Sequence, residues 1–196
     1  TVEHGPVEAL FTVDEETGLT GAFELGEGML TGKYLVNLDS EDEGEIFIGC
    51  AGGIDTIATF HYTMEPSPKN YTFFRVDVSD LQGGHSGDDI DKGRVNSNKT
   101  VARLLWDGMQ SFELKLCYFN GGNLRNAIPR EAYAIFGVPV RFKEEFVKRY
   151  NLFAADLEAE FRFREPNFKI TLNEMPHVDE VLDSRTQSAL VYSLVG

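Results

Sequence analysis

Three carboxylates near the start of the chain have the types and positions expected of a catalytic or metal-binding group. Glu15 and Glu16 follow an apolar segment, residues 7–13, and Asp39 follows a second one, residues 34–38. A carboxylate at the end of a buried strand costs desolvation energy unless it is paired, hydrated or bound to a cation. In sheets that carry helices on their faces, strand ends are also where ligands bind. We therefore expect the chemistry of this region at Glu15, Glu16 and Asp39.

The acidic triplet Asp14-Glu15-Glu16 fits two interpretations. Adjacent carboxylates repel each other, so a bound cation or an unusual protonation state would have to hold them together. In a metal hydrolase one carboxylate binds the cation and the other takes a proton from the attacking water. The alternative is a solvated acidic turn, and the triplet alone favours it. When Asp39 is added, the two interpretations are equally supported. The acidic loop 41–45 lacks the ligand spacing of a calcium loop, and a solvated loop is the better interpretation there.

Two polar loops are further candidates. His85 lies in the sequence Gly83-Gly-His-Ser-Gly87, where glycines give the backbone freedom and leave the imidazole little covered. Such a histidine can donate a hydrogen bond to a developing oxyanion; a flexible loop with an incidental histidine is the alternative, and the loop alone favours it. The loop 123–130 contains Asn126 between two arginines, which could hold a substrate carboxylate. A purely structural loop explains the same residues and is favoured by this segment alone.

Composition excludes several classes of protein. Among 196 residues, 32 Asp and Glu outnumber 18 Lys and Arg, for a formal charge of −14. This charge argues against binding a nucleic-acid backbone, which needs a basic surface, and it favours solubility. The two cysteines, Cys50 and Cys117, provide no disulfide framework, so we expect a reducing, cytoplasmic compartment and two small core residues. No apolar run has membrane-spanning length.

The pattern from residue 71 to residue 173 predicts a β-α-β-β-α-β order. Alternating apolar residues indicate strands, and apolar residues at steps of three and four indicate helices. The predicted strands are 71–78, 112–119, 132–138 and 168–172, and the predicted helices are 91–107 and 141–161. This order is the ferredoxin-like, split β-α-β arrangement, an antiparallel sheet with two helices on one face. A further helix is predicted at 178–194.

The first 52 residues have a different character. They predict short strands at 7–13, 33–38 and 45–49, as in a piece of a larger α/β sheet, and a β-rich stretch follows at 54–62. The glycine pair in Cys50-Ala-Gly-Gly53 indicates a hinge. We therefore predict an α+β chain with two domains, 1–52 and 53–196. Both ends of the chain are abrupt, and we expect it to be a fragment of a longer protein.

Several of these blocks resemble one enzyme family. The relevant segments are Phe11–Gly18, Asn37–Ile46, Gly49–Gly53, Leu81–Ile90, Gly93–Asn96 and Asn126–Ala132. Together they resemble the aminoacyl-histidine dipeptidases (Xaa-His dipeptidases, peptidase D), members of the carnosinase-like M20 family of two-zinc peptidases. The resemblance extends over nearly the whole chain.

The resemblance implies a role for each candidate residue. Glu15 corresponds to the general base that activates the attacking water, and Glu16 and Asp39 correspond to ligands of the two zinc ions. His85 corresponds to the histidine that reaches the active site of the partner subunit and stabilises the tetrahedral oxyanion. Asn126 corresponds to a residue that contacts the substrate.

The resemblance also implies the activity and its limits. Residues 1–52 would be part of the catalytic domain, and 53–196 a lid domain that mediates homodimerisation. The parent enzyme would hydrolyse Xaa-His dipeptides with a metal-activated water, using two zinc ions, with cobalt or manganese as alternatives. The family's other metal ligands would lie outside this chain, so we expect the fragment to be metal-free and inactive. The alternatives are another M20 exopeptidase or deacylase or, for the fragment, a non-catalytic dimerisation module.

Overall fold

The computed structural model describes residues 3–39, 43–50, 52 and 54–196. The chain forms two compact units, Thr1–Ile54 and Asp55–Gly196. No helix in these described segments is both long enough and apolar enough to cross a membrane. Part of the acidic loop 41–45, and two residues of the predicted hinge Cys50–Gly53, lie outside the described residues.

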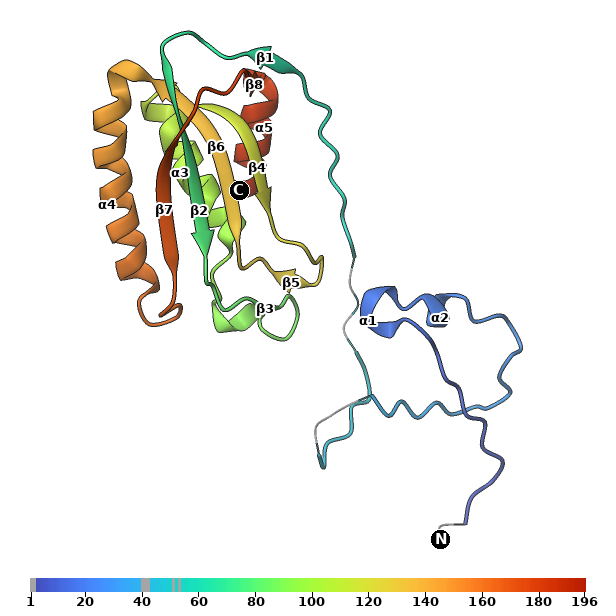
Figure 1. Cartoon of the computed structure of the whole chain (residues 1–196). Helices are drawn as coiled ribbons and strands as arrows, with labels where there is room; N and C mark the ends of the chain where they lie inside the picture. Colours follow the sequence, from blue (N-terminus) through green and yellow to red (C-terminus); the bar gives the residue numbers. More distant parts are fainter. Residues whose placement is uncertain (1–2, 40–42, 51, 53) are drawn as a thin grey trace. The chain divides into compact units, whose positions relative to one another are not determined.

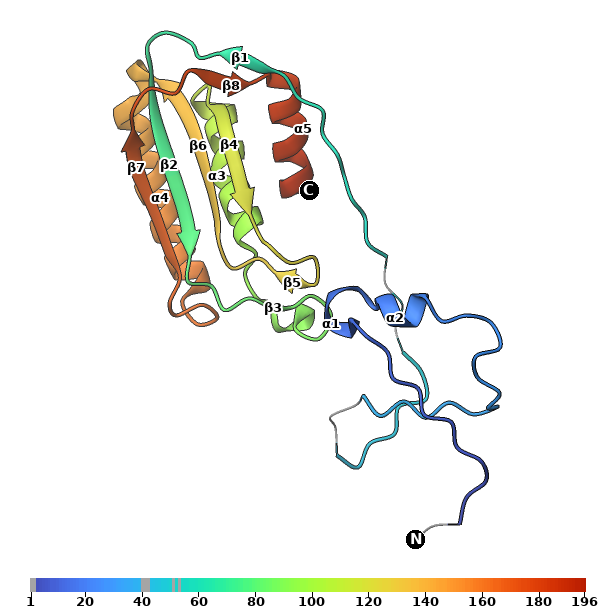
Figure 2. The same cartoon turned by 45° about the vertical axis from the view of Figure 1, so that its right-hand side comes forward.

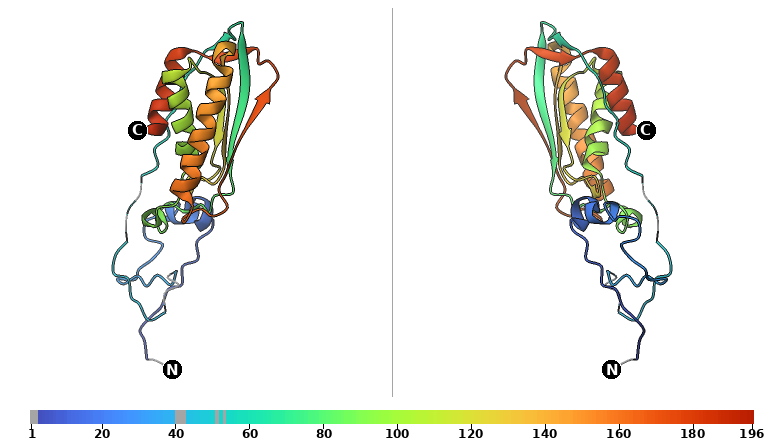
Figure 3. Two further views of the ribbon diagram at one scale, coloured as in Figure 1. Left: turned by 90° about the vertical axis from the view of Figure 1, so that its left-hand side faces the viewer. Right: turned by 90° about the vertical axis from the view of Figure 1, so that its right-hand side faces the viewer.

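The second unit is built on a four-stranded antiparallel sheet with the strand order β4-β6-β2-β7. Its strands are β2 (Tyr71–Ser79), β4 (Lys115–Gly121), β6 (Ala132–Pro139) and β7 (Lys169–Met175). Helices α3 (Ser97–Ser111) and α4 (Lys143–Phe161) both cover one face of this sheet (Figure 1; Figure 3). The chain order β2-α3-β4-β6-α4-β7 and the strand order confirm the predicted ferredoxin-like arrangement.

The core lies between the sheet and the helices. Along β2, Phe74, Val76 and Val78 belong to the buried cluster, while Arg75 and Asp77 alternate with them and are only partly buried. Helix α4 buries one face, composed of Phe146, Tyr150, Leu157 and Phe161, as the spacing predicted. The ring of Phe146 lies 5.4–5.7 Å, centre to centre, from three other aromatic rings, those of Phe74, Phe112 and Phe136.

Helix α3 begins later than predicted. Residues 90–92 form a separate turn of 3₁₀ helix, and Gly93 then takes a positive φ of 65° that interrupts the helical path. Helix α3 starts only after Asn96, whose side chain accepts a hydrogen bond from the Lys99 N–H and caps the first turn. The predicted range 91–107 therefore joined two elements that a glycine separates.

The C-terminal segment differs from the single helix predicted at 178–194. A short strand, β8 (Glu180–Leu182), pairs antiparallel with β1 (Met64–Pro66) before helix α5 (Ser184–Val195) begins (Figure 2). Asp183 separates the strand from the helix, and its carboxylate accepts hydrogen bonds from the Arg185 and Thr186 N–H groups. This N-cap sets the start of α5 and explains why the helix cannot extend back to residue 178.

The strands predicted at 7–13, 33–38 and 45–49 are not formed, and the β-rich stretch 54–62 contains no strand. The described part of the first unit contains only two short helices, α1 (Glu15–Gly18) and α2 (Thr20–Phe23). Its apolar side chains are uncovered: Phe11 is 90% exposed and Ile48 is 100% exposed. A strand requires a neighbour to satisfy its backbone N–H and C=O groups, and no described segment pairs with these stretches. The segments are apolar, as the sequence indicates, but an apolar segment does not by itself supply that neighbour.

Candidate functional site

The structure brings His85 and Asn126 to neighbouring positions. A two-stranded sheet forms between β3 (Gly84–His85) and β5 (Ala127–Ile128), with His85 opposite Ala127. Next to this pair, the Ser86 N–H donates a hydrogen bond to the Asn126 carbonyl at 2.9 Å. Two loops that are distant in sequence are therefore held in one register, and both carry a residue predicted to act on substrate. The described residues of these loops lie at one end of the main sheet (Figure 1).

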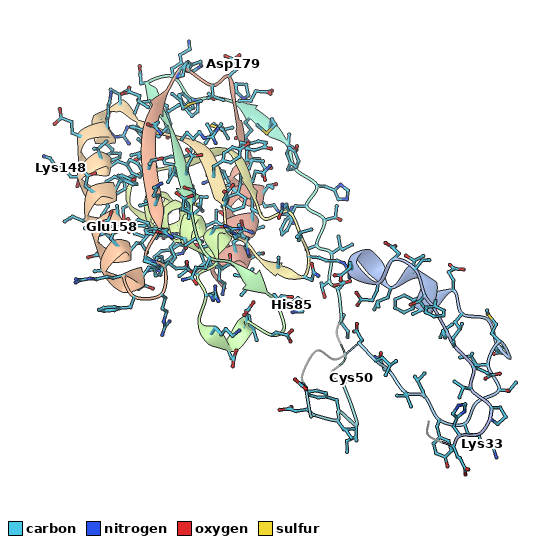
Figure 4. The ribbon with its side chains drawn as sticks, turned by 60° about the horizontal axis from the view of Figure 1, so that its bottom comes forward. Lys33, Cys50, His85, Lys148, Glu158 and Asp179 are labelled. Carbon is cyan, nitrogen blue, oxygen red and sulfur yellow. The ribbon has the colours of Figure 1, made fainter. Side chains whose placement is uncertain are left out.

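The imidazole of His85 has a defined orientation. Its side chain is 53% exposed, and its Nδ1 accepts hydrogen bonds from the backbone N–H groups of Gly87 at 3.1 Å and Asp88 at 3.2 Å. Because Nδ1 serves as an acceptor, the neutral ring carries its proton on Nε2. His85 therefore offers an Nε2–H donor, which is the group needed to stabilise an oxyanion. Figure 4 labels His85 on its loop.

Asp89 holds the backbone of His85, a role that was not predicted from the sequence. Its Oδ2 accepts the His85 N–H at 2.7 Å, and its Oδ1 pairs with the Lys92 ammonium at 2.6 Å. The hydrogen bond from Lys92, together with that from the His85 N–H, lowers the pKa of Asp89 below its ordinary value. The sequence feature that could have indicated this role is an acidic residue four positions after a histidine flanked by glycines.

The glycine before His85 has a steric reason. Gly84 has a φ of +149°, and a Cβ added there would lie 2.5 Å from the Asp89 Oδ2 atom. Any larger residue would therefore strain the backbone and displace the carboxylate that holds His85. The Gly-Gly-His sequence thus reflects a close approach of backbone and side chain as well as loop freedom.

The arginines near Asn126 have intramolecular partners. Arg125 forms an ion pair with Asp55, and Arg130 Nε donates a hydrogen bond to the Leu81 carbonyl at 2.9 Å. Arg130 therefore ties β5 to the start of the His85 loop. These contacts favour the structural interpretation of both arginines and leave Asn126 as the substrate-contact candidate of this loop.

The carboxylates of the first unit are exposed. Glu15 and Glu16 are the first two residues of α1, and Asp39 donates its backbone N–H to the Asn37 side chain at 3.1 Å. In the part of the chain that the structure describes, no three His, Cys, Asp or Glu residues are grouped so that they could hold a metal ion. Carboxylate oxygens are suitable donors to a divalent metal, but the described residues do not complete a metal site. Glu15 and Glu16 are neighbours, and Asp39 is not gathered with them into such a group.

The two cysteines differ. Cys117 is buried, and burial raises the pKa of its thiol to about 12, so it is an inert core residue as predicted. Cys50 is exposed, so its assignment to a core was wrong for this structure. The apolar neighbours of Cys50 in sequence suggested burial, but they are themselves uncovered in this unit.

Two known proteins resemble this chain over almost all of its length. The cytosol non-specific dipeptidase of Escherichia coli (strain K12) is 38% identical over 190 residues, which cover 97% of this chain and 39% of that protein. The chain is homologous to a segment of this dipeptidase. The crystal structure of aminoacylhistidine dipeptidase from Vibrio alginolyticus superposes with a TM-score of 0.81 at 38% identity, covering 94% of this chain and 38% of that one.

These similarities confirm the resemblance that the sequence motifs indicated. The chain spans 39% of the length of the curated relative it matches. No protein-family model matches the chain. The structural match covers 94% of the chain, so it includes the α+β fold of the second unit.

Proposed function

We propose that this chain is part of a longer metal-dependent dipeptidase that hydrolyses Xaa-His dipeptides. Residues 1–52 would contribute to its catalytic domain, and residues 53–196 would form its lid. The observation that carries the proposal is the oriented Nε2–H of His85, on a loop held by backbone pairing. Homology to a dipeptidase over 97% of the chain supports the same conclusion. The preference for a C-terminal histidine is supported by the name of the structural relative alone.

Each candidate residue has one task in this proposal. His85 donates from Nε2 to the carbonyl oxygen of the scissile peptide while negative charge builds on that oxygen. Glu15 accepts a proton from the attacking water and delivers it to the leaving amine, so no covalent intermediate is needed. Asn126, held beside His85 through the Ser86 N–H, offers a carboxamide to the substrate.

Glu16 and Asp39 would supply carboxylate ligands to two divalent metal ions, zinc by proposal, with cobalt or manganese as alternatives. When bound, such ions polarise the substrate carbonyl and make water more acidic. The described residues gather no complete ligand set, so the remaining ligands would come from other parts of the longer polypeptide. We therefore expect weak zinc binding and no dipeptide turnover from the chain alone.

We further propose that the lid mediates a homodimer through β7. The sheet order leaves β4 and β7 at the edges. At the start of β4 the Gln187 side chain accepts a hydrogen bond from the Leu116 N–H and donates one to the carbonyl of Leu114, the residue before the strand. Among the described residues, strand β7 pairs only with β2, and an edge with unpaired N–H and C=O groups is a site for strand addition. A dimerisation module without catalysis is the alternative function that this edge favours, and a cytoplasmic location fits both.

The longer gene product tests the catalytic proposal. It should release histidine from Xaa-His dipeptides in a metal-dependent way, and faster than it cleaves N-acyl amino acids, which another M20 deacylase would prefer. Glu15→Gln should abolish turnover while the metal content is retained. Glu27→Gln, at an exposed glutamate of the same unit, is the matched control and should keep full activity. Turnover that survives Glu15→Gln would remove Glu15 from its role.

A further inference from the structure

One buried carboxylate holds both ends of the loop that carries His85. Glu165 is only 2% exposed. Its Oε2 accepts the Gln82 N–H at 2.7 Å, and its Oε1 accepts the Val95 N–H at 3.1 Å. Gln82 precedes His85 and Val95 follows it, so a single side chain closes the base of the loop 82–95.

The position of Glu165 is itself well fixed. It lies just beyond the end of α4, where its own N–H donates to the Phe161 carbonyl at 2.8 Å. Its carbonyl accepts the Phe168 N–H at 3.0 Å, which anchors the connection to β7. A carboxylate buried in this way must be satisfied by donors, and here two backbone N–H groups of another segment provide them. The segment that follows α4 therefore provides a fixed attachment point for the loop 82–95.

Side chains beside Glu165 reinforce the first end of the loop. The Gln82 side chain donates to the Arg164 carbonyl and accepts from Arg94 at 2.9 Å. Arg94 also donates to the Gly83 carbonyl at 3.1 Å. The backbone at Gln82 and Gly83 is thus held on both sides before the chain enters β3.

The contacts lead from Glu165 to the imidazole along both arms of the loop. On the first arm, the chain runs from Gln82 through Gly83 and Gly84, both at positive φ, into the β3 pairing that contains His85. On the second arm, it runs back from Val95 to Asp89, which accepts the His85 N–H at 2.7 Å. A shift at either end would change how Gly87 and Asp88 reach the imidazole Nδ1.

We propose that Glu165 is a positioning residue for His85: it fixes both ends of the loop and thereby keeps the Nε2–H of the imidazole aimed outward. The catalytic part of this inference rests on the oxyanion role proposed for His85. The structural part, that Glu165 controls the loop, stands apart from catalysis and is tested on this chain alone.

The first test measures amide hydrogen exchange and the ¹⁵N shifts of the His85 ring in Glu165→Gln. The variant keeps the shape but replaces one acceptor oxygen by an NH₂ donor, so one of the two backbone N–H groups loses its partner. Amides of residues 82–89 and 95 should exchange faster by about tenfold or more, and the ring should lose its single tautomer. Amides of the core strand β2, such as Val76, should keep their rates.

Glu158→Gln is the matched control, because Glu158 lies on α4 and is exposed (Figure 4). It should leave both readouts unchanged. Should Glu165→Gln fail to fold, Glu165→Asp keeps the charge and both oxygens but reaches one carbon less, and the same readouts apply. Unchanged loop exchange, or an equal acceleration at Val76, would overturn the positioning role.

The second test is a double-mutant cycle on kcat in the longer polypeptide. His85→Ala should lower kcat by about 10²–10³, as removal of one oxyanion donor does. Glu165→Gln should lower kcat in the wild-type background and cause no further loss in the His85→Ala background, because it acts through His85. If the losses in kcat from the two single substitutions multiply in the double variant, the inference is refuted. An unchanged kcat in His85→Ala would instead refute the proposed function. The hydrogen-exchange experiment would still test whether Glu165 fixes the loop 82–95.

Discussion

The side chain of Gln187 accepts a hydrogen bond from the Leu116 N–H at 2.7 Å, as a neighbouring β-strand would. Its Nε2 donates to the Leu114 carbonyl at 2.9 Å, so one carboxamide satisfies two backbone groups at the edge of β4. Gln187 is 4% exposed and lies on α5. The helix is therefore attached to the sheet by a buried polar contact, in addition to the exposed hydrogen bond from the Lys115 ammonium on β4 to the Ser184 hydroxyl on α5 at 2.6 Å.

Replacing Gln187 by Leu should destabilise the second unit. The substitution keeps the approximate volume but leaves a buried N–H and a buried C=O without partners, at a cost of about 1–3 kcal/mol. Urea denaturation followed by circular dichroism would measure the change in the free energy of unfolding. Gln110→Leu is the control: this glutamine on α3 is exposed and donates only to the exposed Tyr192 hydroxyl of α5, so its loss should change stability by less than about 0.5 kcal/mol. Equal effects of the two variants would contradict the strand-like role of Gln187.

Phe146→Ala should be among the most destabilising single changes. The Phe146 ring is buried and contacts three aromatic rings between α4 and the sheet, so its removal leaves a cavity that rigid neighbours cannot fill. We expect a loss of about 3–5 kcal/mol in the free energy of unfolding. Thermal denaturation would detect it as a lower Tm. Phe163→Ala removes an equally large ring that is 90% exposed, and a comparable loss there would show that the core has been wrongly located.

Much of the fold was accessible from the sequence because its signals are local. The apolar spacing of α4 and the alternation in β2 predicted a helix and a strand that the structure confirms. The pairing of β8 with β1 was missed because it joins Glu180–Leu182 to Met64–Pro66, and no local pattern encodes such a partner. Residues 7–13 show the converse, since an apolar pattern without a described neighbour forms no strand.

The candidate site was predictable only in part, for the same reason. Glycines around His85 mark a loop in the sequence itself, and the structure gives them a steric purpose at Gly84. Glu165 is separated from Gln82 by 83 positions and lies in a charged stretch, Arg162–Glu165, that looks like a solvated helix end. Its burial comes with its contacts to Gln82 and Val95, from the segment that follows α4, and no single-sequence pattern contains such distant contacts.

Asp183 should make part of the stability pH-dependent. A hydrogen bond from the Thr186 hydroxyl, together with backbone N–H donors, lowers its pKa to about 2. An unfolded Asp titrates near roughly 3.9, so the folded state holds this proton less tightly. The stability that the ionised Asp183 carboxylate contributes is therefore fully present above about pH 4 and is lost as the pH falls toward 2.

Asp183→Asn keeps a capping side chain but removes this titration, so its Tm should depend less on pH between about 4 and 2 than that of the wild type. Differential scanning calorimetry across this range would measure the difference. Asp91→Asn, at an exposed aspartate, is the control and should preserve the wild-type pH profile. A profile that Asp183→Asn leaves unchanged would contradict the assigned pKa shift.

Gly84→Ala should disturb the His85 loop while the main sheet stays folded. An alanine Cβ would lie 2.5 Å from the Asp89 Oδ2 atom, on a backbone with φ of +149° that L-residues rarely adopt. Asp89 would have to release the His85 N–H, and the Gly87 and Asp88 N–H groups would lose their alignment with Nδ1. We expect weaker protection of these loop amides, broadened His85 ring resonances, and at least a tenfold lower kcat of the longer polypeptide, as for loss of an aligned oxyanion donor. Gly5→Ala, where a Cβ meets open space and which lies outside the blocks that resemble the enzyme family, should change neither the spectra nor kcat. A Gly84→Ala protein with wild-type His85 resonances would show that the loop tolerates the clash and that the close approach to Asp89 does not position the imidazole.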